Sequence, residues 1–504
     1  MLTPLVPALL FLVFSAALAA ASAVHSGFPG LVLTLERVFP ANESDNLGSL
    51  EARDRSRHAR MLQGVEGVVN FSVSGNSDLS RAGLYFTRVE LGSPPKAFHV
   101  VIDTGSDLLW VNCDSCTNCP YASNLGIELK AFNIGNSSTA SLVSCSHPAC
   151  SSIDQTGVNK CSQNNQRSYS LKYKDGSGTF GYYTSDRFYF DTVLENSVVA
   201  DSSAPIIFGW CGDRCSVSQS GDLTTENRAT DGIFGFGQHD ISVVSQLSRL
   251  GVTPKVFSHC LKGSGGGILV LGEISDPGIV YTPLVKSQAH YYVNLQSISI
   301  NGNVLQIDPT AFSTSSHRGT LIDSGTTLTY LIEEAYDPFI SAVTPVISQY
   351  AAPVDSQGYQ WCYPVPSANL SSFPLVSLNF VGDAPMVLKP EEYLIRAGFE
   401  DNLPLWCVGI LKSNGREPTI LGDLVLKDKI VVYDLERQRV GWADYNCSLS
   451  VRVLPSSLKP DAGQINASIS SRKGNLLPIL TVIGILLLNP RSEYQINIID
   501  TLFI

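Results

Sequence analysis

A ten-residue segment occurs twice in this chain, and this repeat restricts the possible folds more than any other feature. The first copy is Val101–Trp110 and the second is Leu321–Tyr330, 220 residues further on. Both read apolar, apolar, Asp, hydroxyl, Gly, hydroxyl, any residue, Leu, any residue, aromatic. Each copy is followed by a shorter matching segment, Gly232–Gly235 after the first and Thr419–Gly422 after the second. Two lobes built on one plan would produce such a pattern.

Each copy places one carboxylate where an apolar strand meets a glycine-containing turn. The carboxylates belong to Asp103 and Asp323, and Gly105 and Gly325 permit a close backbone approach. One Asp-Thr-Gly alone would be weak evidence, because such tripeptides are common in ordinary turns. Two matching copies indicate a paired site.

Hydroxyl groups lie three residues after each aspartate, in Ser106 and Thr326. We expect them to hydrogen-bond the carboxylates and fix their orientation. If the lobes pack about a pseudo-twofold axis, Asp103 and Asp323 come close enough to share one proton. Such a pair can deprotonate a water molecule with one carboxylate and stabilise an oxyanion with the other.

The rest of the chain reads as mostly β. Apolar and β-branched runs predict strands at Leu84–Leu91 and Ala97–Ile102, separated by a Gly-Ser-Pro-Pro turn. Two hairpins are predicted, Tyr169–Tyr173 with Phe180–Phe190 and Val293–Ile300 with Val304–Ile307. Helical periodicity is confined to Ser242–Leu250 and Glu333–Ser348.

Between Gly83 and Cys447 the sequence resembles the pepsin-like aspartic proteases, in particular the cysteine-rich plant branch that includes the nepenthesin-like enzymes. The two repeats resemble that family's catalytic loops, and Thr419–Asp423 with Val431–Asp434 resembles its C-terminal signature. The resemblance implies a bilobed fold of two related β-barrel-like lobes with the active site between them. It implies hydrolysis of polypeptides at acidic pH by Asp103 and Asp323. It implies no cofactor and no metal, and we expect a monomer.

The resemblance also implies a flap over the substrate. Tyr173 stands at the flap tyrosine's position in Tyr-x-Asp-Gly-Ser, where it would cover the substrate and contact Trp110. From the residues alone, Tyr173 reads as a cross-strand packing residue. Lys174 departs from the family pattern, which has Gly there. The implied substrate-binding set is Tyr173, Trp110, Asp175, Gly176 and Thr327.

Twelve cysteines suggest disulfide bonds in an exported chain. We expect six bonds of undetermined pairing among Cys113, Cys116, Cys119, Cys145, Cys150, Cys161, Cys211, Cys215, Cys260, Cys362, Cys407 and Cys447. A zinc site is the alternative, but no well-spaced histidine completes a ligand set. The net charge of −11 argues against a nucleic-acid partner.

The N-terminal region reads as export and processing signals. An apolar run followed by Ala21-Ser22-Ala23 predicts a signal peptide over residues 1–23, and a membrane anchor is less favoured because the run is short. Residues 24–80 are predicted to be a propeptide, with a basic helix near Glu51–Met61, and a Gly/Asn/Ser-rich linker, Gly64–Ser80. We expect passage through the secretory pathway to the extracellular space or cell surface rather than the vacuole. Six glycosylation sequons agree with that route: Asn42, Asn70, Asn136, Asn369, Asn446 and Asn466.

After an N-terminal lobe at 81–280 and a C-terminal lobe at 281–447, residues 448–504 form a Ser/Asn-rich tail. Small residues at 466–468 and the apolar run Leu476–Leu488 resemble a glycosylphosphatidylinositol (GPI) anchor signal, which would attach the protein to a membrane. The tail departs from that pattern because polar residues follow the run. A transmembrane helix would need about 20 apolar residues.

Three other functions were weighed. A binding or inhibitor protein on the same two-lobed fold would be expected to lose an aspartate or part of the flap, whereas this chain keeps both. A glycosidase also uses two carboxylates but does not need them in duplicated loops. A serine hydrolase is disfavoured because no Gly-x-Ser-x-Gly motif is present.

Overall fold

The computed structural model describes residues 68–75, 84–114, 116–147, 161–162, 165–193, 199–210, 218–315, 318–356, 359–415 and 417–454. The predicted signal peptide, the basic helix at Glu51–Met61 and the apolar run of the tail lie outside these ranges. None of the helices in the described part of the chain has the length and hydropathy needed to cross a bilayer.

Strands dominate the described chain. The strands of the first half are β1 (Val68–Gly75), β2 (Tyr85–Leu91), β3 (Lys96–Asp103), β4 (Leu109–Val111), β5 (Ser141–Leu142), β6 (Ser168–Lys172), β7 (Gly178–Val193), β8 (Val199–Trp210), β9 (Ser218–Ser220), β10 (Gly232–Gly235), β11 (Val256–Leu261), β12 (Gly267–Leu271) and β13 (Glu273–Ile274). Those of the second half are β14 (Val280–Pro283), β15 (Tyr292–Val293), β16 (Leu295–Ile300), β17 (Asn303–Val304), β18 (Thr320–Ile322), β19 (Thr329–Leu331), β20 (Val354–Ser356), β21 (Tyr359–Pro364), β22 (Val376–Phe380), β23 (Ala384–Leu388), β24 (Leu394–Glu400), β25 (Leu403–Val408), β26 (Ile410–Lys412), β27 (Thr419–Leu421), β28 (Lys429–Asp434), β29 (Arg439–Asp444) and β30 (Val453–Leu454).

Helices are few and short. The α-helices are α4 (Val243–Arg249), α5 (Glu333–Ile347), α6 (Pro390–Tyr393) and α7 (Asp423–Leu426). Five 3₁₀ turns accompany them within the described ranges: η2 (Ile134–Asn136), η4 (Gly221–Thr224), η5 (Glu226–Arg228), η6 (Pro309–Phe312) and η7 (Ser367–Ser372). The mostly β, pepsin-like class inferred from the sequence is confirmed.

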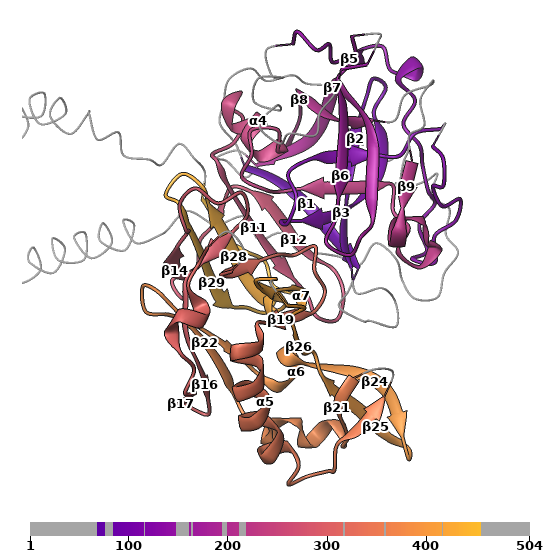
Figure 1. Ribbon diagram of the computed structural model, residues 1–504. Helices are drawn as coiled ribbons and strands as arrows, with labels where there is room; N and C mark the ends of the chain where they lie inside the picture. Colours follow the sequence, from indigo (N-terminus) through magenta and orange to yellow (C-terminus); the bar gives the residue numbers. More distant parts are fainter. Residues whose placement is uncertain are drawn as a thin grey trace, which may run out of the picture. The chain divides into compact units, whose positions relative to one another are not determined.

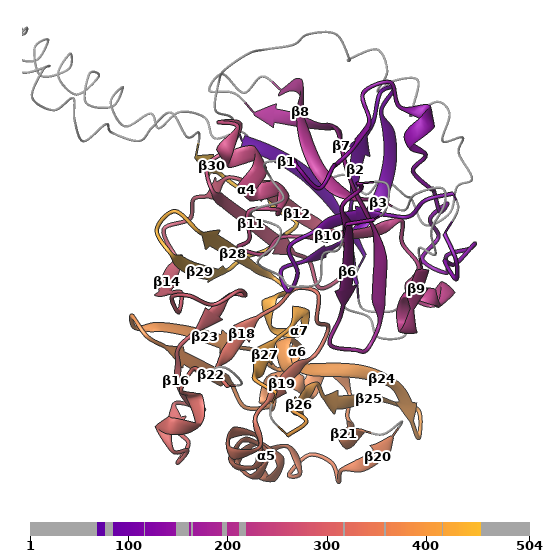
Figure 2. The ribbon, with the colours of Figure 1, turned by 45° about the horizontal axis from the view of Figure 1, so that its top comes forward.

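The two sequence repeats adopt the same local topology. In the first half, β10 lies between β3, with which it is parallel, and β4, with which it is antiparallel. In the second half, β27 lies between β18 (parallel) and β19 (antiparallel) in the same way. Figure 2 shows β10 beside β3 and β27 beside β18 and β19. Each of these short strands, β10 and β27, therefore lies between the two strands that flank a loop carrying an aspartate.

Gly235, the last residue of β10, and Gly422, the residue directly after β27, explain why the short motif is repeated. A side chain at Gly235 would collide with the backbone at Asp107 and Leu108. A side chain at Gly422 would collide with the carbonyl oxygens of Thr326 and Leu328. Glycine at both positions therefore lets a strand pack directly against the loop.

A central sheet joins segments that are far apart in sequence. Strand β11 pairs with β12 on one side and with β28 on the other. The sheet begins at β14, and its order there is β14-β29-β28-β11-β12-β1. Figure 1 shows these strands side by side in the middle of the view. The disulfide between Cys260 and Cys447 fastens this sheet to the segment after β29.

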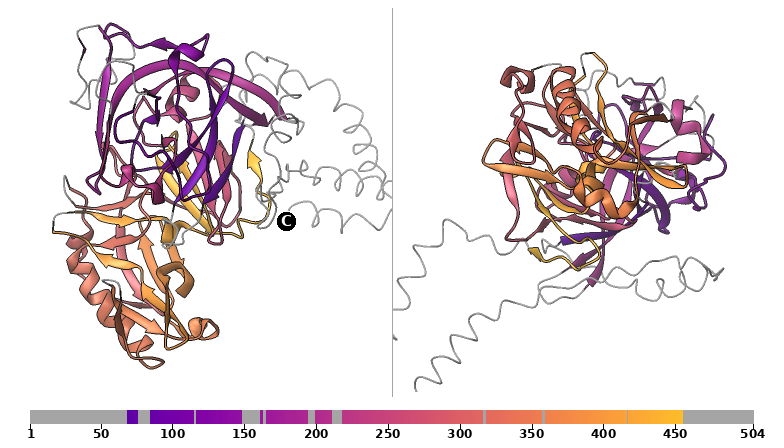
Figure 3. Two further views of the ribbon diagram at one scale, coloured as in Figure 1. Left: turned by 90° about the vertical axis from the view of Figure 1, so that its right-hand side faces the viewer. Right: turned by 90° about the horizontal axis from the view of Figure 1, so that it is seen from below.

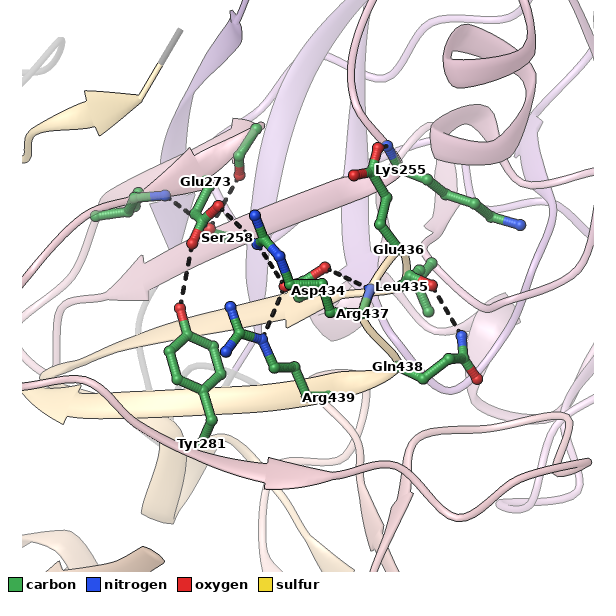
Figure 4. A network of polar contacts seen from close by, with 12 residues as sticks. Lys255, Ser258, Glu273, Tyr281, Asp434, Leu435, Glu436, Arg437, Gln438 and Arg439 are labelled. Carbon is green, nitrogen blue, oxygen red and sulfur yellow. Dashed lines mark hydrogen bonds and ion pairs between the residues drawn. The ribbon is translucent and has the colours of Figure 1, made fainter. Parts of the chain in front are cut away.

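A charged network closes one end of the central sheet (Figure 4). The fully buried carboxylate of Asp434 accepts hydrogen bonds from Arg437 and from Arg439, at 2.8 and 2.9 Å. Arg437 also contacts Glu273 at 3.1 Å, and Arg439 lies 3.8 Å from the ring centroid of Tyr281. The network connects the β28–β29 hairpin to β13 and β14.

Helix α5 packs on the strands of the second half through one face. Its buried residues are Ala335, Phe339, Ile340, Val343 and Ile347, which recur at helical spacing. The left view of Figure 3 shows the helix lying alongside the orange strands.

Most predicted elements are present, with two corrections. Val68–Gly75 falls inside the predicted linker, and the linker prediction is wrong there because these residues form β1 and pair with β2, β7 and β12. The second strand of the Val304–Ile307 hairpin ends at Val304. Its continuation turns away because the Ile307 N–H bonds to the Leu305 carbonyl and leads into η6.

Four disulfides are present in the described chain. They join Cys116 to Cys119, Cys145 to Cys161, Cys260 to Cys447 and Cys362 to Cys407. Cys113 is buried, whereas Cys150, Cys211 and Cys215 lie outside the described ranges. The disulfide-bonded class is confirmed, and the full count of six stays a prediction.

Candidate active site

The structure brings Asp103 and Asp323 together. Asp103 is the last residue of β3 and Asp323 directly follows β18. A side chain at Gly105 would lie 2.6 Å from a carboxylate oxygen of Asp323, and one at Gly325 would collide with Asp103. Each loop therefore needs glycine where it faces the other loop's carboxylate.

The two carboxylates are held in the same way. In each, one oxygen accepts the backbone N–H two residues further on, from Gly105 at 2.8 Å or Gly325 at 2.9 Å. The other oxygen accepts a hydroxyl three residues on, from Ser106 in the first loop and from Thr326 in the second, at 2.7 Å. The hydrogen bonds expected from the repeat are present in both copies.

A reciprocal pair of hydrogen bonds ties the loops to each other. The Thr104 N–H donates to the Ser324 hydroxyl at 3.3 Å, and the Ser324 N–H donates to the Thr104 hydroxyl at 2.8 Å. The Ser324 hydroxyl donates in turn to the carbonyl of Ile102. The sequence reasoning assigned no role to Thr104 or Ser324, although a hydroxyl after each aspartate was part of the repeat.

The electrostatics of the pair favour one retained proton. Burial, and next the negative charge of Asp323, raise the pKa of Asp103 to about 7. The hydroxyl of Ser106 and the N–H of Gly105 act in the opposite direction, because they stabilise the ionised form. The titration belongs to the pair, so the pair holds one proton up to about neutral pH.

The hairpin β6–β7 carries the predicted flap residues at its turn. The Tyr173 N–H bonds to the Ser177 carbonyl at 2.8 Å, and Asp175 accepts the Ser177 N–H and hydroxyl. Gly176 has φ +85°, which glycine adopts readily. The Trp110 indole N–H donates to the Tyr173 hydroxyl at 2.7 Å, so the expected contact between these residues exists.

Tyr173 also belongs to the surroundings of the dyad. Burial, and next the charge of Asp103, raise the pKa of its hydroxyl, which accepts the indole N–H of Trp110. Lys174, next to it, is exposed, and its charge interacts with Asp323 and with Glu417. The flap turn therefore brings a cation into the field of the two aspartates.

The remaining member of the predicted substrate-binding set, Thr327, follows Thr326 in the second loop. Its carbonyl accepts the N–H of Leu424 at 3.0 Å, which fastens the loop to α7. Its role toward a substrate stays a prediction.

A third carboxyl group lies near the pair and was missed. Asp423, at the start of α7, is 1% exposed, and its Oδ1 has no hydrogen-bond partner among the described residues. Burial, then the charges of Asp323 and Asp103, raise its pKa well above the usual range. In the sequence, Asp423 is recognisable only as the last residue of Thr419–Asp423, which resembles the family's C-terminal signature. No local pattern marks it as buried.

The described chain offers neither a metal site nor a second pocket at the aspartates. It contains no group of three or more His, Cys, Asp or Glu side chains arranged to hold a metal ion. A surface hollow of about 520 Å³ is lined by residues 118–121, 219–221, 224 and 226, so it contains neither aspartate.

Comparisons with known proteins identify the family and the fold. The family described as "Xylanase inhibitor N-terminal" matches residues 85–273, and that described as "Xylanase inhibitor C-terminal" matches residues 290–444. Three solved structures share the fold at 20% identity and TM-scores of 0.58–0.60. Among them, "edgp" is covered over 96% of its length and soybean basic 7S globulin over 100%, with 76% and 78% of this chain aligned.

Sequence relatives define the family more closely. Aspartic proteinase 36 of Arabidopsis thaliana is 36% identical over 88% of this chain and 90% of its own length. Aspartic proteinase 39 of the same species is 35% identical over 88% and 91%. Aspartic proteinase nepenthesin-1 of Nepenthes gracilis is 31% identical over 84% and 91%. The chain therefore belongs to the pepsin-like aspartic protease family of plants.

Proposed function

We propose that this protein is an aspartic endopeptidase in which Asp103 and Asp323 activate a water molecule. The observation that carries the proposal is the reciprocal geometry of the two loops, in which each aspartate faces the other loop's glycine. Family membership and the raised pKa of Asp103 support it. No group beyond the two carboxyls is required for this chemistry.

The proposed reaction begins with one shared proton on the pair. Asp103 keeps this proton, and ionised Asp323 removes a proton from a water molecule held between the carboxyls. The resulting hydroxide oxygen bonds to the carbonyl carbon of the peptide, while protonated Asp103 stabilises the oxyanion. Collapse of this intermediate breaks the C–N bond, and the leaving nitrogen takes up the proton that Asp323 removed from the water molecule.

Ser106 and Thr326 act in this scheme by fixing the carboxylate planes. Each hydroxyl occupies one lone pair of one carboxylate oxygen, so the remaining lone pairs stay available to water. Tyr173 and its neighbours in the flap would close over an extended polypeptide. We propose that Trp110 holds the tyrosine hydroxyl through the 2.7 Å bond.

A second candidate function is binding without catalysis. It is favoured by the matching families, which are described as xylanase inhibitors, and by structural neighbours such as soybean basic 7S globulin. The presence of both aspartates with both sets of supporting hydrogen bonds argues for the peptidase.

Acid-pH hydrolysis of a denatured protein substrate separates the two functions. We expect cleavage by the purified protein, inhibition by pepstatin, and a loss of about 10³-fold or more in kcat/KM for Asp103→Asn. Asp308→Asn, which alters an exposed aspartate outside the site, is the matched control. Equal activity of Asp103→Asn and the unaltered protein would overturn the proposal.

We also propose that the chain enters the secretory pathway and is carried to the cell surface or beyond. The four disulfides support an oxidising compartment. We further propose that a GPI anchor attaches the protein to the membrane. Release from membranes by a phosphatidylinositol-specific phospholipase supports it, and retention after that treatment counts against it.

A further inference from the structure

The surface hollow of about 520 Å³ lies beside the hairpin that carries the flap. Its lining includes Gln219 and Ser220 of β9 and Gly221, the first residue of η4. Strand β9 pairs with β7 at residues 178–180, which directly follow the flap turn. The hollow therefore shares a strand with the flap, although neither aspartate lines it.

The segment from β9 through η4 also packs against the flap itself. A side chain at Gly221 would lie 2.8 Å from the Cα atom of Ser177, so the backbone of η4 is in close contact with the flap turn. Leu223, two residues further on, packs with Tyr173 against the apolar cluster that contains Trp110. One segment thus lines the hollow and supports the tyrosine of the flap.

Another wall of the hollow, residues 118–121, is fastened before and after the residues that line it. On the preceding side, the Thr117 carbonyl accepts the N–H of Gln219 at 3.3 Å. On the following side, the Asn124 N–H donates to the Glu226 carbonyl at 2.9 Å. These hydrogen bonds join the two walls, so the hollow exists before any ligand binds.

The chemistry of the lining suits a cation. Among the described residues that line the hollow, Glu226 is the one charged side chain, and it is exposed. Tyr121 is 96% exposed, so its ring is available to a ligand. The nearby Arg228 lies 3.7 Å from Asp222 and has an acidic partner there. A carboxylate with an exposed aromatic ring can hold an ammonium or guanidinium group by charge and by a cation–π contact.

We propose that this hollow binds a lysine or arginine side chain of the polypeptide substrate, with Glu226 and Tyr121 as specificity-determining residues. The inference rests on the proposed peptidase function. Strand β9 lies about 4.8 Å from β7, the usual spacing of paired strands, and a long basic side chain spans that distance from a peptide under the flap. The volume of about 520 Å³ falls within the range of ligand pockets, roughly 300–1,000 Å³.

The first experiment measures binding without catalysis. The probe is acetyl-trilysine amide, titrated into the full-length protein by calorimetry at low salt. We expect Glu226→Gln to raise the Kd about fivefold, and high salt to remove the difference, because salt screens an exposed ion pair. The matched control is Glu400→Gln, which removes one negative charge from an exposed position on β24. Equal Kd values for the two variants would overturn the proposal.

The second experiment tests the aromatic ring with the same probe. Tyr121→Leu removes the ring and should raise the Kd about threefold, whereas Tyr121→Phe keeps a ring and should bind nearly as the unaltered protein does. Equal binding by the leucine and phenylalanine variants would overturn the part assigned to Tyr121.

The third experiment links the hollow to cleavage. Peptides of one sequence carry a single lysine, or glutamine in its place, at successive positions on either side of the cleaved bond. We expect lysine to raise kcat/KM about fivefold at one or two positions, mainly through KM, and Glu226→Gln to abolish that preference. A preference that survives in Glu226→Gln would overturn the proposal. Absence of cleavage of every peptide by the unaltered protein would count against the peptidase function, while trilysine binding still decides whether the hollow holds a cation.

Discussion

The backbone N–H of Ser324 donates a 2.8 Å hydrogen bond to the side-chain hydroxyl of Thr104, 220 residues earlier in the chain. Both residues are buried, and each directly follows one of the two aspartates. This contact joins the two copies of the sequence repeat. It means that the spacing of the carboxyls depends on two small hydroxyl side chains as well as on the packing of the lobes.

Ser324→Ala is the first test of this dependence. The change removes the acceptor of the Thr104 N–H and leaves that buried group without its partner, which should cost about 1–3 kcal/mol of unfolding free energy. Activity should fall at least tenfold, since the loops lose one of their ties. Urea unfolding and kcat are the measurements.

Ser324→Thr is the matched control for that variant, because the first copy already has threonine at this position. It should keep both hydrogen bonds and most of the activity. Equal behaviour of the alanine and threonine variants would contradict the role assigned to the hydroxyl.

The raised pKa of Asp103 predicts the upper pH limit of activity. Because the pair must retain one proton, kcat/KM should be lost as pH rises through about 7, falling tenfold per unit beyond it. A pH profile measured with a non-titrating peptide substrate checks this. A limit near pH 4 would show that the two carboxyls do not share a proton as described.

Lys174 should influence the same limit. Its positive charge interacts with Asp323 and favours the ionised form of the pair. Lys174→Met should therefore move the alkaline limit upward by a few tenths of a pH unit, whereas Lys174→Arg should leave it in place. Identical profiles for the two variants would argue that the flap cation does not act on the dyad.

The paired aspartates could be predicted from sequence because duplication encodes their symmetry. The same repeat placed Ser106 and Thr326 correctly, since a hydroxyl three residues away in a tight turn reaches the carboxylate. The flap hairpin followed from its turn residues. For these hydroxyls and for the flap, the determining contacts lie within a few residues along the chain.

The missed features depend on contacts between distant segments. Strand β1 has Val69, Phe71 and Val73 buried at a period of two, but its Gly, Asn and Ser content outweighed that short alternation. Tyr433 and His259 meet only through pairing of β11 with β28, 174 residues apart. No local pattern reveals which strands become neighbours in a sheet whose spatial order differs from the order of its strands in the sequence.

Asp434 is expected to support the fold in mildly acidic solution. Burial alone would raise its pKa, but hydrogen bonds from Arg437 and Arg439 lower it below the usual value. Its stabilising effect is therefore present above pH 4 and is lost as pH falls through the lowered pKa. Asp434→Asn should reduce the unfolding free energy at pH 6 by about 3–5 kcal/mol, because two arginines lose a buried partner. Urea unfolding at pH 6 and pH 3 checks this, and an equal loss at both pH values would contradict it.

Asp423 should have the opposite effect on stability. Its folded-state pKa is raised well above 3.8, first by burial and then by Asp323 and Asp103, so the folded protein keeps a proton that the unfolded chain releases near pH 4. Stability must therefore fall as pH rises from about 4 toward the folded-state pKa. Asp423→Asn removes this dependence with little change of shape. Its Tm should exceed that of the unaltered protein at pH 7 and approach it at pH 3, measured by calorimetry at both pH values. If Asp423→Asn instead lowers the Tm at pH 7 and lowers it less at pH 3, Asp423 is ionised in the folded state.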